Sequence, residues 1–282
     1  MKLYSIKKVG IVGVGFMAGS LALALKESFS NISISGYARS KESYLKLKKL
    51  RILDKIERDL SKVVKDADMV ILAMPVGAIV DYLKPLSGLL KKGAIVLDLG
   101  SSKRLISNAA KKHLGKKAVF IGCHPLCGSE KSGPGSSCKD LYKDSICLIT
   151  ADATDPGIKV VKKLWQGVGS KVVFINPDFH DKVLSSVSHF PHVISFILTY
   201  LVPENYHRFA SGSFKDLTRI SGSSAYVWAD IFLSNKDNLL KDAEAFIRAL
   251  RGFTDTLKKG DRERIVKFIK KVNYKNSKIS KL

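Results

Sequence analysis

A glycine-rich turn near the N-terminus constrains the fold of this chain more than any other feature. The apolar run Val9–Val12 leads directly into the sequence Gly13-Val-Gly15-Phe-Met-Ala18, and an apolar helical pattern follows. In such a unit the first glycine permits a tight turn, the second lets the backbone approach a pyrophosphate, and the small third residue lets the helix pack closely on the sheet. The first N–H groups of the helix would bind the pyrophosphate. The motif predicts a dinucleotide site that includes Gly13, Gly15, Phe16 and Met17.

Strand and helix patterns alternate along the first part of the chain. Short Val- and Ile-rich runs are separated by amphipathic stretches such as Ser20–Glu27, Ser43–Leu50, Val80–Leu90 and Pro156–Gly167. This alternation predicts an α/β fold, a doubly wound Rossmann-type parallel sheet over residues 1–177. The expected strands are Val9–Val12, Ile32–Ser35, Met69–Ala73, Ile95–Asp98, Val119–Gly122, Ile146–Thr150 and Lys171–Ile175.

The pattern changes after the turn Asn176-Pro-Asp178, where Asp178 is a candidate helix cap. From there apolar residues recur at spacings of three and four, which indicates helices, and no strand pattern follows. We therefore expect residues 178–282 to form an all-helical domain for substrate binding and dimerisation. The Lys- and Ser-rich tail from Asn273 is expected to fray.

The apolar runs and the cysteines indicate in which cellular compartment the protein is expected. The longest apolar run, Val193–Val202, is shorter than the roughly 20 residues of a membrane-spanning helix, and the N-terminus lacks the pattern of a secretory signal. The four cysteines lie between Cys123 and Cys147 at spacings that match zinc sites poorly, so reduced thiols are favoured. We expect a cytoplasmic protein with no metal site and no membrane partner.

The chain is strongly basic, with 48 Lys and Arg against 25 Asp and Glu and a formal net charge of +23. Such a field attracts anions, including nucleic acids and anionic metabolites. The lysines are spread along the whole chain, and no RNA-recognition or zinc-finger signature is present. A solvated lysine-rich surface is therefore favoured over a nucleic-acid partner.

The end of the second expected strand bears on the choice of dinucleotide. A carboxylate there would bind the ribose 2′-hydroxyl of NAD, whereas an arginine would favour the 2′-phosphate of NADP. The sequence has no carboxylate at this point and reads Ala38-Arg39-Ser40. Arg39 and Ser40 could hold a phosphate, which favours NADP. In the alternative, Arg39 is a surface charge or stacks on adenine, and NAD remains the cofactor.

Candidate cofactor, substrate and catalytic residues follow three later strands, at the edge where ligands bind in open α/β sheets. Pro75, a candidate cofactor-binding residue, follows one strand, and Ser101 follows the next, where it is either a substrate ligand or a helix cap. His124 follows a third strand within a segment rich in glycine, hydroxyl and charged residues, which continues to Gly133. His124 suits a general base near neutral pH, although a lone histidine is more often structural.

The helical domain supplies a second set of candidates. His189 and His192 lie three apart and share a helix face, but two ligands without a carboxylate do not predict a metal site. Lys215 and Arg219 lie four apart and could clamp substrate carboxylates, with Arg219 able to bind in bidentate fashion. The alternative is an exposed basic helix face.

Taken together, these motifs resemble those of the prephenate/arogenate (cyclohexadienyl) dehydrogenase family of tyrosine biosynthesis. The resemblance extends from Val9 to about Leu250. Ala38 is a departure, because many NAD-dependent members carry Asp there. The segments that carry the resemblance are the glycine turn at Gly13, Ala67–Val76, Asp98–Lys103, His124–Gly133, Ser188–His192 and Phe214–Ile220.

The resemblance implies oxidative decarboxylation of prephenate to 4-hydroxyphenylpyruvate, or of arogenate to tyrosine, with hydride transfer to NAD(P)+. It implies that His124 binds the C4 hydroxyl as acceptor or base and that Ser101 supports it. Arg219 and His192 would bind the substrate, and a homodimer would form through the helical domain. Ser129 and Glu130 would lie near the substrate side chain, and Glu130 is associated with preference for prephenate.

Two other functions fit parts of the sequence. A different NAD(P)-dependent dehydrogenase, such as a β-hydroxyacid dehydrogenase, would share the cofactor domain and a helical partner domain. A non-catalytic NADP- or nucleic-acid-binding protein would account for the charge of +23. Neither a nucleic-acid site nor a simple NADP-binding module needs the segment around His124 together with the pair Lys215 and Arg219.

Overall fold

The computed structural model describes residues 6–127, 131–151 and 155–279 of the chain. Two compact units, Met1–Lys236 and Asp237–Leu282, make up the molecule. The first unit contains the sheet, the helices that flank it and the first helices after it. Because this division falls elsewhere, the domain boundary at residue 177 stays a prediction.

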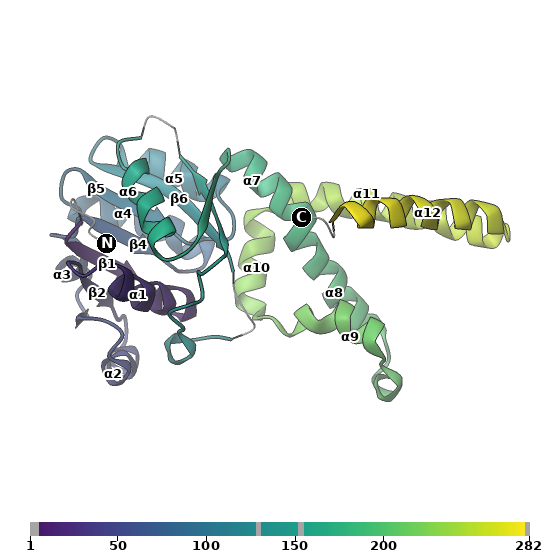
Figure 1. The fold of residues 1–282 in the computed structure, drawn as a ribbon, viewed down its shortest axis with the longest axis horizontal. Helices are drawn as coiled ribbons and strands as arrows, with labels where there is room; N and C mark the ends of the chain where they lie inside the picture. The colour runs from purple at the N-terminus through teal and green to yellow at the C-terminus, as the bar shows by residue number, and fades with distance from the viewer. Residues whose placement is uncertain (1–5, 128–130, 152–154, 280–282) are drawn as a thin grey trace. The chain divides into compact units, whose positions relative to one another are not determined.

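An eight-stranded sheet forms the centre of the first unit (Figure 1), in the order β3-β2-β1-β4-β5-β6-β7-β8. Over the described residues every neighbouring pair is parallel except β6 and β7, which run antiparallel. The α/β fold class is confirmed. The strands are β1 (Lys8–Val12), β2 (Ser33–Tyr37), β3 (Lys55–Glu57), β4 (Met69–Leu72), β5 (Ala94–Asp98), β6 (Ala118–Leu126), β7 (Ile146–Thr150) and β8 (Lys171–Phe174).

Helices cover both faces of the sheet. Leu21 of α1 and Trp165 of α6 belong to the apolar core on one face, and Ile79 of α4 and Ile106 of α5 to the core on the other. All four side chains are buried, as expected for a sheet that is enclosed on both sides. The flanking helices are α1 (Phe16–Ser28), α2 (Lys41–Leu50), α3 (Leu60–Val64), α4 (Val76–Leu89), α5 (Arg104–Leu114) and α6 (Ile158–Gly167).

Strand β6 is longer than the sequence pattern predicts. It continues past Gly122 through His124 and Pro125 to Leu126, and these last residues pair with β7. The expected end at Gly122 was wrong because Pro125 lacks an N–H and reads as the end of a strand. His124 is therefore held by a ladder of strand pairing and not by a flexible loop.

After β8 the described residues form helices joined by short turns, with no strand among them, which confirms the all-helical second part. Asn176, and not Asp178, caps the first helix, and its side chain accepts hydrogen bonds from the N–H groups of Asp178 and Phe179. The helices are α7 (Pro177–Leu184), a π-helical turn (Ser185–His189), α8 (Phe190–Leu201), a 3-10 turn (Glu204–Phe209), α9 (Gly212–Thr218), a 3-10 turn (Arg219–Gly222) and α10 (Ala225–Ser234).

The second unit is a pair of helices, α11 (Lys236–Lys258) and α12 (Arg262–Ile279). The rings of Phe253 and Phe268 pack between them with centroids 5.5 Å apart. Helix α12 continues through the tail that was expected to fray. That prediction was wrong for residues 273–279, which are helical although all of them are exposed.

One helical stretch, Pro177–Leu201, is long and apolar enough to cross a membrane by length and composition alone. The sequence prediction missed it because the uninterrupted apolar run Val193–Val202 is shorter than the helix that contains it. Core helices of proteins outside membranes meet the same criterion. This stretch also carries the buried polar residues His180, Asp181 and His189.

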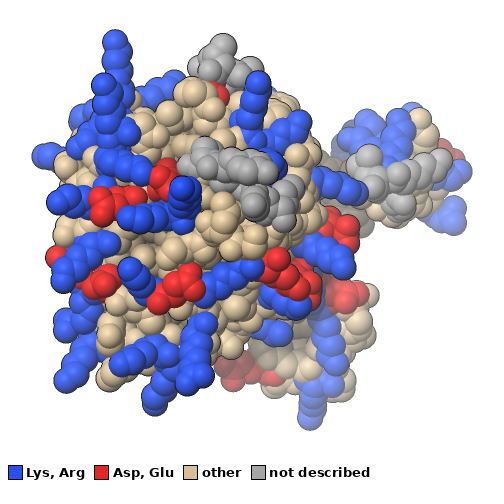
Figure 2. All heavy atoms as spheres, turned by 60° about the vertical axis from the view of Figure 1, so that its left-hand side comes forward, with Lys and Arg blue, Asp and Glu red and all other residues tan. Residues whose placement is uncertain are grey.

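Basic side chains are distributed over the molecular face that Figure 2 shows. Acidic side chains lie between them, so that no separate basic stripe stands out on this face. A nucleic-acid site usually concentrates its cations on one surface. On this face the distribution agrees with the solvated lysine-rich surface that the sequence favours.

Candidate active site

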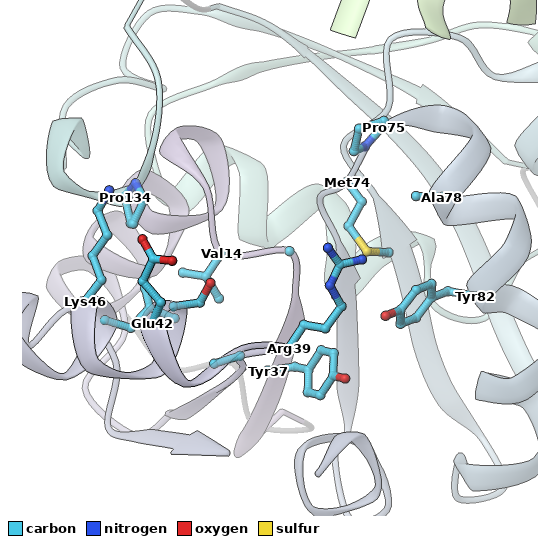
Figure 3. A pocket seen from close by; sticks show the side chains of 14 residues that line it. Val14, Tyr37, Arg39, Glu42, Lys46, Met74, Pro75, Ala78, Tyr82 and Pro134 are labelled. Atoms are coloured by element: carbon cyan, nitrogen blue, oxygen red, sulfur yellow. The ribbon is translucent and has the colours of Figure 1, made fainter. Parts of the chain in front are cut away.

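A cavity of about 590 Å³ lies beyond the carboxyl ends of β1, β2 and β4 (Figure 3), and Gly13 and Pro75 are in its wall. Gly13 has a φ of +90°, and a Cβ there would lie 2.5 Å from the carbonyl oxygen of Ala73. Only glycine fits this turn. Gly15 has open space at its Cβ position, and no side chain caps the helix that it precedes. The turn therefore fits a pyrophosphate bound by backbone N–H groups.

The predicted cofactor residues contribute to this cavity in different ways. Arg39 is in its wall, together with Glu42 and Lys46. The Ser40 hydroxyl instead caps α2, where it accepts a hydrogen bond of 3.0 Å from the N–H of Ser43. Among the described residues, Gly15, Phe16, Met17 and Ser40 are outside the wall, so their contribution would come from the backbone.

A second cavity, of about 640 Å³, brings together four of the predicted substrate and catalytic residues. Ser101 comes from the turn after β5, His124 from β6, His192 from α8 and Arg219 from the 3-10 turn after α9. Lys215 is exposed and, in the described part of the chain, is not in this wall. Ser129 and Glu130 lie outside the described residues.

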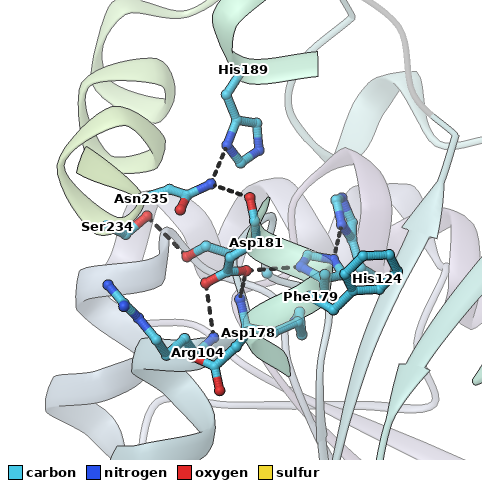
Figure 4. Close-up of polar contacts among 12 residues, drawn as sticks. Arg104, His124, Asp178, Phe179, Asp181, His189, Ser234 and Asn235 are labelled. Atoms are coloured by element: carbon cyan, nitrogen blue, oxygen red, sulfur yellow. Dashed lines mark hydrogen bonds and ion pairs between the residues drawn. The ribbon is translucent and has the colours of Figure 1, made fainter. Parts of the chain in front are cut away.

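A chain of hydrogen bonds runs from His124 into the helical part (Figure 4). His124 Nδ1 lies 2.9 Å from His180 Nε2, and His180 Nδ1 lies 2.8 Å from Asp181 Oδ1. The Asp181 carboxylate also accepts bonds of 2.7 and 3.0 Å from the N–H groups of Lys103 and Arg104. Burial raises the pKa of Asp181, but these hydrogen bonds outweigh it and hold the pKa below its usual value.

The ionised carboxylate fixes the proton positions along this chain. Because the Asp181 carboxylate only accepts, His180 carries its proton on Nδ1. Neutral His180 then accepts at Nε2, so His124 donates from Nδ1 and its own Nε2 carries no proton. Burial holds the pKa of His124 well below the usual value, and the nearby His180 and Lys103 add to this effect. His124 is thus a neutral imidazole with a free basic nitrogen.

A dinucleotide cavity and a basic imidazole are both typical of a dehydrogenase. Comparisons with known proteins identify the family. Residues 21–174 match the family model described as "Prephenate dehydrogenase, nucleotide-binding domain". Residues 176–271 match "Prephenate dehydrogenase, dimerization domain". The chain belongs to the prephenate dehydrogenase family. It is an oxidoreductase with a domain for binding a nicotinamide dinucleotide.

Individual members of the prephenate dehydrogenase family are similar over nearly the whole chain. Prephenate dehydrogenase of Bacillus subtilis is 32% identical over 270 residues, which are 92% of this chain and 72% of that protein. Cyclohexadienyl dehydrogenase of Zymomonas mobilis is 29% identical over 274 residues, which are 94% of this chain and 93% of that protein. The crystal structure of prephenate dehydrogenase from A. aeolicus with hydroxyphenyl propionate and NAD+ has a TM-score of 0.89 at 34% identity, over 98% and 99% of the two chains.

A buried ion pair joins the two strands that carry the site in this prephenate dehydrogenase family member. The ammonium group of Lys103 bonds to the Asp98 carboxylate and, at 2.8 Å, to the carbonyl oxygen of Cys123. The same carboxylate accepts from the N–H groups of Gly100 and Cys123, at 2.8 and 3.3 Å. Lys103 and Asp98 are fully buried. The pair therefore holds the turn with Ser101 beside the strand with His124.

Aromatic contacts orient the other end of the cavity. The rings of His192 and Trp228 stack with centroids 3.5 Å apart and planes inclined by 21°. His192 Nδ1 lies 2.9 Å from the carbonyl oxygen of Ser188, to which it donates. Burial lowers the pKa of His192, and the guanidinium of Arg219 also lowers it, against the effect of the Ser188 bond. His192 and Arg219 line the same cavity.

Sequence reasoning missed His180, Asp181, Lys103 and Asn235 as parts of the site. His180 and Asp181 lie on α7, where polar residues usually face solvent, and both are buried. The pair Asp98 and Lys103 was within a recognised motif, and its charges at the end of a buried strand were the available signal. For His180, Asp181 and Asn235 only tertiary contacts reveal the role.

Proposed function

We propose that this chain catalyses the oxidative decarboxylation of prephenate to 4-hydroxyphenylpyruvate, or of arogenate to tyrosine. The observation that carries the proposal is that His124 lines a cavity with Ser101 and Arg219 and is hydrogen-bonded through His180 to Asp181. The similarity to prephenate and cyclohexadienyl dehydrogenases supports the choice of substrates. A bound nicotinamide ring would supply the hydride acceptor.

His124 acts as the base of the reaction. Its Nε2 accepts the proton of the C4 hydroxyl while the hydrogen on C4 leaves as hydride and a C4 carbonyl forms. The bond from the ring to its carboxylate then breaks, CO2 leaves, and the electron pair makes the ring aromatic. His124 returns its proton to the resulting phenolate oxygen. The carboxylate of Asp181 stabilises the imidazolium through His180.

The remaining cavity residues bind and orient the substrate. Arg219 pairs with a substrate carboxylate, with His192 beside it, and Ser101 hydrogen-bonds to the C4 hydroxyl or to His124. We also place Ser129 and Glu130 near the substrate side chain, with Glu130 favouring prephenate over arogenate. We also propose the exposed Lys215 as a further cation that attracts substrate carboxylates.

We propose NADP+ as the preferred cofactor and NAD+ as the weaker one. Arg39 and Lys46 are in the wall of the dinucleotide cavity, and these two cations outnumber the carboxylate of Glu42. Ala38, at the end of β2, offers no carboxylate to a ribose 2′-hydroxyl. Both observations favour a 2′-phosphate.

We further propose a cytoplasmic homodimer that forms through the helical part and binds neither nucleic acid nor a membrane. Several apolar side chains there are exposed, including Tyr200 at 88% and Tyr226 at 90%. Large exposed apolar surface in a helical domain is typical of subunit interfaces. The description of the matching family model as a dimerization domain supports the same assembly.

Steady-state kinetics with prephenate and arogenate, each crossed with NAD+ and NADP+, tests the proposal. We expect reduced nucleotide together with 4-hydroxyphenylpyruvate or tyrosine, and a higher kcat/KM with NADP+ than with NAD+. If purified protein forms no reduced nucleotide from either substrate, the proposed activity is wrong. A β-hydroxyacid dehydrogenase would instead oxidise a 3-hydroxy acid and ignore both compounds.

A further inference from the structure

His189 is a buried residue of the substrate cavity with a defined partner at only one of its ring nitrogens. Its side chain is in the cavity wall, and only 1% of the residue is exposed. Nδ1 lies 3.1 Å from Nδ2 of Asn235. The proposed mechanism above does not use this residue.

Asn235 determines which nitrogen of His189 carries the proton. Its Nδ2 also donates a 2.7 Å hydrogen bond to the backbone carbonyl oxygen of Asp181. Only the nitrogen end of the amide can face that carbonyl, since two oxygens would repel each other. The same Nδ2 must therefore donate to His189 Nδ1, which accepts (Figure 4).

Neutral His189 consequently carries its proton on Nε2. This atom is buried and has no hydrogen-bond partner among the described residues. Burial lowers the pKa of His189 to about 4, although Asp181 acts in the opposite direction, so the neutral form persists near neutral pH. A buried N–H without an acceptor is rare and costly. The nitrogen faces away from Asn235 in Figure 4, and the residue that carries it lines the cavity.

We propose that His189 is a substrate-binding residue that donates its Nε2–H to an oxygen of the bound acid. The inference rests on the proposed function, because that substrate brings carboxylate, hydroxyl and carbonyl oxygens into this cavity. Trp228, which stacks on His192, contacts the His189 ring edge-on, with ring centroids 6.2 Å apart. This contact helps to hold the plane of the His189 ring. Arg219 attracts a substrate carboxylate through its positive charge, whereas His189 provides a neutral hydrogen-bond donor whose direction is fixed.

Two matched variants separate the two nitrogens of His189. In His189→Gln the side-chain amide nitrogen can reach the position of Nε2, whereas in His189→Asn it reaches only as far as Nδ1. We expect His189→Asn to weaken binding of 3-(4-hydroxyphenyl)propionate, measured by calorimetry with oxidised nucleotide present, by about tenfold. KM for the substrate should rise by a similar factor, with a smaller change in kcat. His189→Gln should recover most of both losses.

Nitrogen NMR of wild-type protein labelled at histidine gives a test that needs no variant. We expect His189 to show a protonated Nε2 and an unprotonated Nδ1, and the Nε2–H signal to shift when 3-(4-hydroxyphenyl)propionate binds. A proton on Nδ1, or an Nε2–H signal that ignores the ligand, would overturn the inference. So would equal affinity of wild type and His189→Asn for this compound.

The two proposals fail in distinguishable ways. If wild-type protein reduces no nucleotide with prephenate or arogenate, the proposed function fails whatever the tautomer of His189. If wild type turns over its substrate and His189→Asn binds the propionate as tightly as wild type, only the role of His189 is rejected.

Discussion

The basicity of His124 depends on residues far away in the sequence. His180 and Asp181, on α7, hold the proton of His124 on Nδ1 and leave Nε2 free to act. We expect His124→Asn to lower kcat by about 100-fold or more, because the amide cannot accept a proton. Rates of nucleotide reduction at saturating substrate measure this loss. Near-normal turnover in a folded variant would reject the role of His124 as a base.

The same residue predicts the acidic limb of the pH profile. Only unprotonated His124 can accept the hydroxyl proton, so activity is lost as pH falls through the pKa of His124. Burial holds that pKa well below the usual value. We therefore expect kcat/KM to stay level as pH is lowered past about 6.5, the usual histidine pKa, and to fall only at more acidic pH. An acidic limb centred near 6.5 or above would contradict this environment for His124.

Arg39 and Ser40 were predicted as a pair but have different surroundings. Arg39 is in the wall of the dinucleotide cavity, whereas the hydroxyl of Ser40 caps α2. Arg39→Ala should raise KM for NADP+ by roughly tenfold or more, since hydrogen bonds between charged groups are worth about 1.5–3 kcal/mol, and should change KM for NAD+ less. Ser40→Ala is the matched control and should mainly destabilise α2. Equal effects of Arg39→Ala on both cofactors would remove the argument for NADP+.

At the scale of elements, the sequence predicted the strands and helices whose apolar pattern is set by burial. Strands such as β4 and β5 are enclosed on both faces, so they read as continuous apolar runs. Strand β3 was missed because it has three residues and none is fully buried. Helix α5 was also missed, although its apolar face packs in the core. The part of the site on β6 was found by its motif, whereas the part on α7 needs tertiary structure.

The ion pair of Asp98 and Lys103, whose ammonium group also bonds to β6, provides a prediction about elements. Lys103→Met leaves the Asp98 carboxylate buried without its cation, since both side chains are fully buried. We expect a loss of about 3–5 kcal/mol in the free energy of unfolding. Lys91→Met is the matched control, because the side chains of Lys91 and Asp68 are 41% and 21% exposed. Their ion pair should contribute less than about 1 kcal/mol to the free energy of unfolding. Urea unfolding curves of both variants measure the difference, and equal losses would show that burial of the pair is unimportant.

At the scale of the whole molecule, two surface properties oppose each other. Each chain carries a formal charge of +23, which repels a second copy. The helical part nevertheless exposes apolar side chains, including Leu233 at 72% and Tyr226 at 90%, which favour association. Helix α10 carries both residues. A dimer that forms despite its charge must bury enough of this apolar surface to outweigh the repulsion.

This balance makes the dimer sensitive to salt in a defined direction. At physiological ionic strength charges more than about 8 Å apart are largely screened, so added salt should weaken the repulsion and lower the dimer Kd. Leu233→Glu places a carboxylate in the apolar surface and should shift the protein toward monomer at every salt concentration. Leu45→Glu, on α2 and 48% exposed, is the control and should leave the dimer intact. Sedimentation equilibrium at low and high salt distinguishes the cases, and a dimer that Leu233→Glu leaves unchanged must form through another surface.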